Sequence, residues 1–191
     1  MAFPAETVGI LGLGLIGGSL ASALRESGFS QQFIGYGYRD NSLRRGVELG
    51  VIDDFTLDLD ELIERSDILV ICAPTLVAAD LLGQILQRTA DMENGPVITD
   101  AASVKGSLLA AARAACGGEL PARLVLGHPI AGSERSGVEA SDPNLFRDHR
   151  VILTPVEGND PAALELVRRM WESTGAEVVS MAVEDHDKVL A

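Results

Sequence analysis

The stretch VGILGLGLIGGSL, residues 8–20, decides the fold of this chain. An apolar run leads directly into a glycine-rich turn, in which Gly12, Gly14 and Gly17 form the pattern G-x-G-x-x-G. The residues that follow predict a helix, which Gly28 ends. A strand, a glycine turn and a helix in this order are what the phosphate-binding turn of a dinucleotide site requires. The stretch therefore predicts a nucleotide-binding α/β unit at the start of the chain.

Each glycine of this turn has an expected physical role. Gly12 permits the tight turn, Gly14 lets the backbone approach the pyrophosphate, and Gly17 lets the helix pack closely on the strand. Leu15 and Ile16 are expected to contact the cofactor where the helix begins, since the first N–H groups and partial positive charge of the helix face the phosphates. The alternative interpretation is a glycine-rich turn with no ligand.

Short apolar runs alternate with helical patterns along the rest of the chain. We expect strands at residues 7–11, 33–38, 67–73, 96–100, 124–128, 150–155 and 176–181, and helices at residues 16–27, 42–49, 77–87, 104–115 and 161–173. Alternation of this kind predicts a parallel sheet that is covered on both faces. The expected fold class is therefore α/β, a doubly wound and mostly parallel Rossmann-type sheet with helices on both faces.

Composition excludes several classes of protein. The net charge is −13, from 15 Lys and Arg against 28 Asp and Glu, so the chain lacks the basic face of a nucleic-acid binder. No apolar run reaches the roughly 18 residues of a membrane span, and the N-terminus lacks the pattern of a signal peptide. Cys72 and Cys116 are expected to be reduced core thiols. We therefore expect a cytoplasmic protein with neither a nucleic-acid nor a membrane partner.

The end of the second expected strand bears on the choice between NAD and NADP. An acidic residue at this position usually bonds the ribose 2′-hydroxyl of NAD, but the position falls near Gly37, which has no side chain. Arg39 could pair with the 2′-phosphate of NADP, because a guanidinium matches phosphate oxygens. Asp40 could serve NAD instead if the strand runs two or three residues further. The sequence thus predicts a dinucleotide cofactor and leaves NAD and NADP open.

One of the three histidines is a candidate catalytic base. His128 ends the expected strand 124–128, which directs it to the crevice beyond the carboxyl ends of the strands. A base is needed there to take a proton as hydride leaves a carbinol. His149 is flanked by charges and is expected to be solvated, while His186 lies on the tail and suits a structural role such as a hinge. The alternative for His128 is a structural residue at a strand end.

Five blocks carry a resemblance to a known family. VGILGLGLIGGSLA, VITDAASVKG, LGHPIAGSERSGVEAS, VILTP and MAVEDHDKVLA occur in this order, and together they span essentially the whole chain. The chain resembles the nucleotide-binding domain of the prephenate dehydrogenase family, which includes cyclohexadienyl and arogenate dehydrogenases. GHPIAGSE and TDAASVKG are far more specific than the glycine turn. The resemblance implies NAD(P)-dependent oxidative decarboxylation of prephenate to 4-hydroxyphenylpyruvate, or of arogenate to tyrosine, in tyrosine biosynthesis and without a metal.

The resemblance also implies roles for particular residues. His128 accepts a hydrogen bond from the ring hydroxyl of the substrate, and Ser103 lies beside that hydroxyl and the nicotinamide. The helix that follows Ser103 gives this serine an alternative role as a helix N-cap. Lys105 and Arg135 are expected to be solvated. The remaining implied site residues are Ser133 and Glu134 for the substrate, with Glu134 at the mouth, and Ala73 and Pro74 for the cofactor.

The resemblance further implies how the chain is divided. Residues 1–181 are expected to form the NAD(P)-binding domain, and residues 182–191 to begin the linker helix to a helical domain that this chain does not include. In the family that domain forms the homodimer and supplies basic residues for the substrate carboxylates. We therefore expect the chain to bind nucleotide, to catalyse poorly alone and to be monomeric. Two alternatives are another Rossmann hydroxyacid dehydrogenase or reductase, and a nucleotide-binding module without catalysis.

Overall fold

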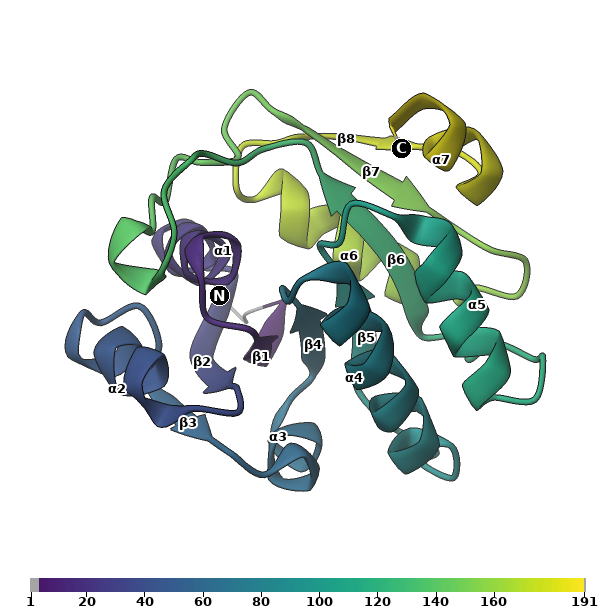
Figure 1. Cartoon of the computed structure of the whole chain (residues 1–191), viewed down its shortest axis with the longest axis horizontal. Helices are drawn as coiled ribbons and strands as arrows, with labels where there is room; N and C mark the ends of the chain where they lie inside the picture. Colours follow the sequence, from purple (N-terminus) through teal and green to yellow (C-terminus); the bar gives the residue numbers. More distant parts are fainter. Residues whose placement is uncertain (1–3, 191) are drawn as a thin grey trace.

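One sheet with the strand order β3-β2-β1-β4-β5-β6-β7-β8 organises the chain in the computed structural model, which describes residues 4–190 (Figure 1). Neighbouring strands are parallel except for β6 and β7, which are antiparallel. The strands are β1 (Ala5–Leu11), β2 (Ser30–Tyr36), β3 (Asp54–Thr56), β4 (Ile68–Ile71), β5 (Val97–Asp100), β6 (Leu124–Pro129), β7 (Arg150–Thr154) and β8 (Glu177–Ser180). The chain builds outward from β1 to β3 and then returns to place β4 on the other side of β1. This reversal creates a crevice at the carboxyl ends of β1 and β4, the usual ligand position in such sheets.

Helices cover both faces of the sheet. They are α1 (Leu15–Ser27), α2 (Asp40–Glu48), α3 (Leu59–Arg65), α4 (Thr75–Thr89), α5 (Lys105–Ala115), α6 (Pro161–Glu172) and α7 (Val183–Leu190), with a 3₁₀ turn at Val138–Ala140. Apolar residues of α1, α2 and α6 pack on one face, and those of α3, α4 and α5 pack on the other. Figure 1 shows α4 and α5 side by side across the sheet, with α7 against α5 at the C-terminal end.

Successive side chains along a strand point to opposite faces of the sheet, so one strand contributes to both hydrophobic cores. In β4, Ile68 and Val70 belong to the core under α1 and α6, whereas Leu69 and Ile71 belong to the core under α4 and α5. All four side chains are fully buried. A strand that is buried on both faces has no polar side, which is why this segment is a continuous apolar run in the sequence.

The expected α/β class and its mostly parallel sheet are confirmed. The strand expected at residues 33–38 begins earlier, at Ser30, and ends at Tyr36. β3 and α3 were not predicted from the sequence, because with three and seven residues they are too short to give a clear period. Among the described residues, no helix is long and apolar enough to cross a membrane.

Candidate active site

A crevice of about 540 Å³ lies at the carboxyl ends of β1, β4, β5 and β6. The turn after each of these strands contributes to its wall, and the loop between β6 and β7 closes one side. The lining residues are Gly14, Leu15, Ile16, Cys72, Ala73, Pro74, Thr75, Ala101, Ala102, Ser103, His128, Pro129, Ala131, Gly132, Ser133, Arg135, Ser136 and Gly137. Residues from the glycine turn, the TDAASVKG block and the GHPIAGSE block thus meet in one place.

The glycine turn has the geometry that a dinucleotide pyrophosphate needs. Gly12 has a φ of 97°, and a Cβ there would lie 2.9 Å from the carbonyl oxygen of Cys72. A Cβ on Gly17 would overlap the carbonyl oxygen of Gly12, so α1 packs too closely for a side chain. Gly14 faces open space instead. The first turn of α1 has neither a capping side chain nor an acidic residue, which leaves its N–H groups available to an anion such as the phosphates of NAD(P).

The end of β2 differs from the usual NAD pattern. The strand ends at Tyr36, Gly37 follows, and α2 begins at Asp40 with Arg39 as its N-cap residue. A role for Asp40 toward the ribose of NAD required the strand to continue to that residue. The strand ends before it, so this condition is not met. The Asp40 carboxylate accepts a hydrogen bond of 2.9 Å from Nε of Arg44. Arg39 is exposed and lies outside the lining of the crevice.

Ser103 lies in the turn between β5 and α5, where its exposed side chain lines the crevice. The N-cap residue of α5 is Val104, and no side chain at that position caps the helix. Asp187 of α7 accepts hydrogen bonds from the backbone N–H groups of Lys105 and Gly106 in its place. The alternative role of Ser103 as an N-cap is therefore wrong, and its hydroxyl remains available to a ligand.

Lys105 is fully buried, so the expectation that it is solvated is wrong. Its ammonium forms an ion pair with Asp100, itself 1% exposed, and donates a hydrogen bond of 2.5 Å to the carbonyl of Gly127. Oδ1 of Asp100 accepts from the N–H of Gly127 at 3.0 Å. Burial lowers the pKa of Lys105, and the attraction of Asp100 opposes that shift. The pair joins the end of β5 to the residue that precedes His128.

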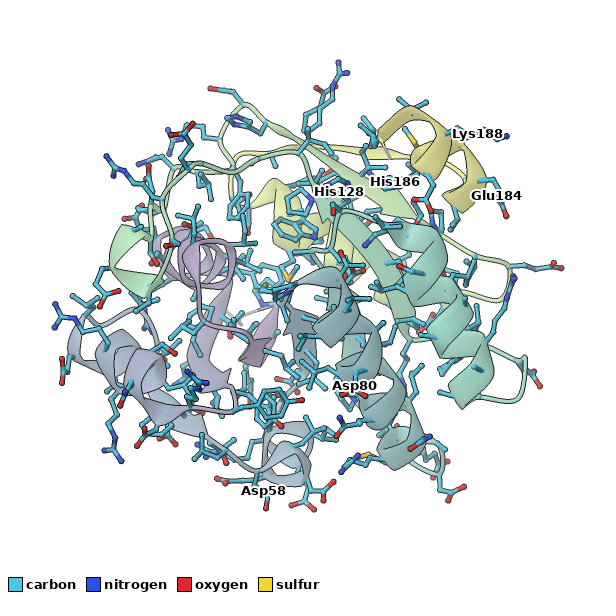
Figure 2. The ribbon with its side chains drawn as sticks, in the orientation of Figure 1. Asp58, Asp80, His128, Glu184, His186 and Lys188 are labelled. Carbon is cyan, nitrogen blue, oxygen red and sulfur yellow. The ribbon has the colours of Figure 1, made fainter. Side chains whose placement is uncertain are left out.

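His128 is half-buried at the end of β6, where it lines the crevice. Burial, followed by the positive charge of Lys105 and the neighbouring His186, lowers its pKa to about 4, although Asp187 acts in the opposite direction. His128 is therefore neutral near pH 7, as a proton acceptor must be. Its Nδ1 lies 2.9 Å from Nε2 of His186. Figure 2 shows the two imidazoles next to each other, one from β6 and one from α7.

His186 is fully buried in this contact, so it has a packed position beside His128 that the sequence did not predict. Its partner is 58 positions away in the sequence, so no local pattern revealed the pair. The block MAVEDHDKVLA was the available signal, because it belongs to the resemblance and contains this histidine.

The loop after β6 brings polar groups to the crevice. Ser133 and Arg135 both line it, and the Oγ atom of Ser133 accepts a hydrogen bond of 3.2 Å from the N–H of Arg135. Arg135 is exposed, as expected, yet its position gives the crevice a guanidinium that the sequence analysis did not anticipate. Glu134 is exposed between these two residues and is not part of the lining.

The family described as prephenate dehydrogenase, nucleotide-binding domain, matches residues 20–180. The chain belongs to this family. The prephenate dehydrogenase of Bacillus subtilis (strain 168) is 33% identical over 186 residues, which make up 96% of this chain and 48% of the relative. The chain therefore spans about half the length of that curated relative.

Two solved structures of this family share the fold closely. The prephenate dehydrogenase of A. aeolicus, in complex with hydroxyphenyl propionate and NAD+, is 36% identical with a TM-score of 0.84. The arogenate dehydrogenase of Synechocystis is 29% identical with a TM-score of 0.82. Each match covers 96% of this chain and 62% of the solved chain.

Replacing Lys105 with methionine tests the buried ion pair. Lys105→Met leaves the Asp100 carboxylate buried without its partner, and we expect the free energy of unfolding to fall by about 3–5 kcal/mol. Urea denaturation measures the change. The matched control is Lys188→Met, at an exposed lysine, for which we expect a change within about 0.5 kcal/mol. Similar free energies of unfolding for the two variants would contradict the stabilising role of the Lys105–Asp100 ion pair.

Proposed function

We propose that this chain is the nucleotide-binding part of an NAD(P)-dependent dehydrogenase that oxidatively decarboxylates prephenate, arogenate or both, in tyrosine biosynthesis. The observation that carries the proposal is the crevice shared by Gly14, Ser103 and His128 at three strand ends. The solved relatives support it, since one holds NAD+ with hydroxyphenyl propionate and another is an arogenate dehydrogenase. The proposal concerns the protein at its natural length, because this chain spans about half of the B. subtilis relative.

The chemistry assigned to this site needs one proton acceptor. The nicotinamide supplies the acceptor for the hydride that leaves the carbinol carbon of the substrate ring. His128 accepts the proton of the ring hydroxyl while that oxygen becomes a carbonyl. The ring carboxylate then leaves as carbon dioxide, and its bonding electrons complete the aromatic ring. The phenolate oxygen takes the proton back from His128, which ends the cycle neutral.

The other residues of the crevice bind and orient in this proposal. Ser103, in the turn after the strand next to that of His128, orients the substrate hydroxyl for proton and hydride loss. Arg135 offers its guanidinium to a substrate carboxylate. Without such a local positive group, the net charge of −13 would disfavour the binding of an anion. Further proposed contacts are Ser133 and Glu134 toward the substrate, Ala73 and Pro74 beside the nicotinamide end of the cofactor, and Gly12, Gly14, Leu15, Ile16 and Gly17 at the pyrophosphate.

Substitution of His128 tests the proposed base. We expect His128→Asn to lower kcat for prephenate or arogenate by about 10²–10⁴-fold, which is the usual contribution of a general base. Affinity for the dinucleotide should stay the same. The rate of cofactor reduction in the protein at its natural length is the measurement. His149→Asn is the matched control, because His149 is exposed outside the crevice and should be dispensable. Near-normal turnover by His128→Asn would refute the assignment.

Arg39 is proposed to favour NADP over NAD, because Gly37 offers no carboxylate to the ribose and the Asp40 carboxylate is paired with Arg44. Calorimetric titration should give tighter binding of NADPH than of NADH. Arg39→Ala should weaken NADPH binding by about 10-fold or more, the value of a charged hydrogen bond, and leave NADH unchanged. Arg45→Ala on α2 is the control, because Arg45 pairs with Glu48 and leaves the Asp40–Arg44 pair intact. Equal affinity of the unaltered chain for the two cofactors would remove this role from Arg39.

A further inference from the structure

A chain of hydrogen bonds runs from the crevice through the buried His186 to the partly exposed Asp187, both on α7. Nδ1 of His128 lies 2.9 Å from Nε2 of His186, and Nδ1 of His186 lies 2.7 Å from Oδ1 of Asp187. His128 lines the crevice, whereas His186 is fully buried behind it (Figure 2). The reaction proposed above gives neither His186 nor Asp187 a role, although His186 contacts the proposed base and Asp187 contacts His186.

The carboxylate at the far end decides where the protons lie along this chain. Ionised Asp187 only accepts hydrogen bonds, so Nδ1 of His186 carries a proton and donates it. In neutral His186, Nε2 then has a lone pair, and Nδ1 of His128 must donate to it. The proton of neutral His128 is thereby fixed on Nδ1. Its Nε2 keeps the lone pair that a substrate hydroxyl needs as an acceptor.

Asp187 is held in its ionised form by the N–H groups around it. Oδ1 accepts from the backbone N–H of Lys105 at 3.0 Å, and Oδ2 accepts from that of Gly106 at 2.7 Å. Burial raises the pKa of Asp187, but these two bonds and the one from His186 outweigh it, and the pKa is lowered overall. The carboxylate also lies at the N-terminus of α5, where the helix dipole favours an anion.

Burial and the nearby positive charge of Lys105 keep His128 neutral. Lys105 of α5 lowers the pKa of His128, and Asp100 of β5 is bonded to that lysine. Asp187 of α7 acts on this pKa in the opposite direction. A neutral imidazole has two tautomers, and only one of them has an acceptor on Nε2. The contact with α7 therefore selects which nitrogen of His128 can act.

We propose that His186 and Asp187 are positioning residues that hold His128 as the Nδ1–H tautomer, with Nε2 free to accept the proton of the substrate hydroxyl. The use of that nitrogen rests on the proposed function, whereas the tautomer does not. When His128 gains the proton, its Nδ1–H bond to His186 strengthens, and the ionised Asp187 stabilises the positive charge through the chain. α7 is thus part of the site, although neither of the two residues reaches the crevice lining.

Nuclear magnetic resonance tests the tautomer directly. In long-range ¹H–¹⁵N correlation spectra at pH 7, we expect a protonated, pyrrole-type Nδ1 and a pyridine-type Nε2 for His128. His149→Gln removes the exposed histidine and His128→Asn removes the His128 signals, which assigns the three rings. A protonated Nε2 on His128 in the unaltered protein would overturn the proposal, whatever reaction the protein catalyses.

Two substitutions of His186 separate positioning from packing. Glutamine offers an oxygen that can accept the Nδ1–H of His128, whereas phenylalanine fills the space without an acceptor. We expect His186→Phe to populate both tautomers of His128 and to lower kcat by about 10- to 100-fold, comparable with the loss when the partner that orients a metal-bound histidine is removed. His186→Gln should retain most of kcat, and neither variant should change the affinity for NADPH.

The outcomes distinguish this inference from the function on which it rests. Equal loss of kcat in the two variants, with the His128 tautomer of the unaltered protein in both, would reduce His186 to a packing residue and overturn the proposal. Absence of prephenate and arogenate turnover by the unaltered protein would contradict the proposed function instead. In that case the spectra of the unaltered protein still decide the tautomer.

Discussion

The buried ion pair between Lys105 and Asp100 fixes the part of the molecule in which the candidate chemistry takes place. Asp100 ends β5 and Lys105 begins α5, so the pair closes the turn that carries Ser103. Both side chains also bond the backbone of Gly127, one to its N–H and the other to its carbonyl. The next residue is His128. The relative position of the proposed base and the proposed orienting hydroxyl thus depends on one charge pair that solvent does not reach.

A strongly acidic chain must offer local positive charge to bind anionic ligands. The first turn of α1 does so through backbone N–H groups, without any basic side chain. Arg135, on the loop after β6, adds a guanidinium to the crevice lining. Lys105 lies too deep to contact a ligand, but its charge helps to keep His128 neutral. The positive groups that can bind an anionic ligand are therefore different from the one that keeps His128 able to accept a proton.

Local features of the sequence predicted most of the fold and part of the candidate site. The glycine turn is short and contiguous, and the buried strands are continuous apolar runs, so both could be recognised without the structure. His128 was found as a candidate because it ends a strand, and a strand end fixes which edge of the sheet a side chain occupies. The burial of Lys105 could not be found in this way, since it depends on Gly127, 22 residues further on. The pairing of His186 with His128 also joins elements that are distant in sequence.

The proposed reaction depends most on His128 being a neutral proton acceptor at the edge of the crevice. A pH titration of its ring resonances in the cofactor-free protein measures this directly. Because burial and the nearby positive groups disfavour the imidazolium, the account predicts that His128 stays neutral as the pH falls and gains its proton only near pH 4. A midpoint near 6.5, the ordinary value for a solvated histidine, would contradict the account.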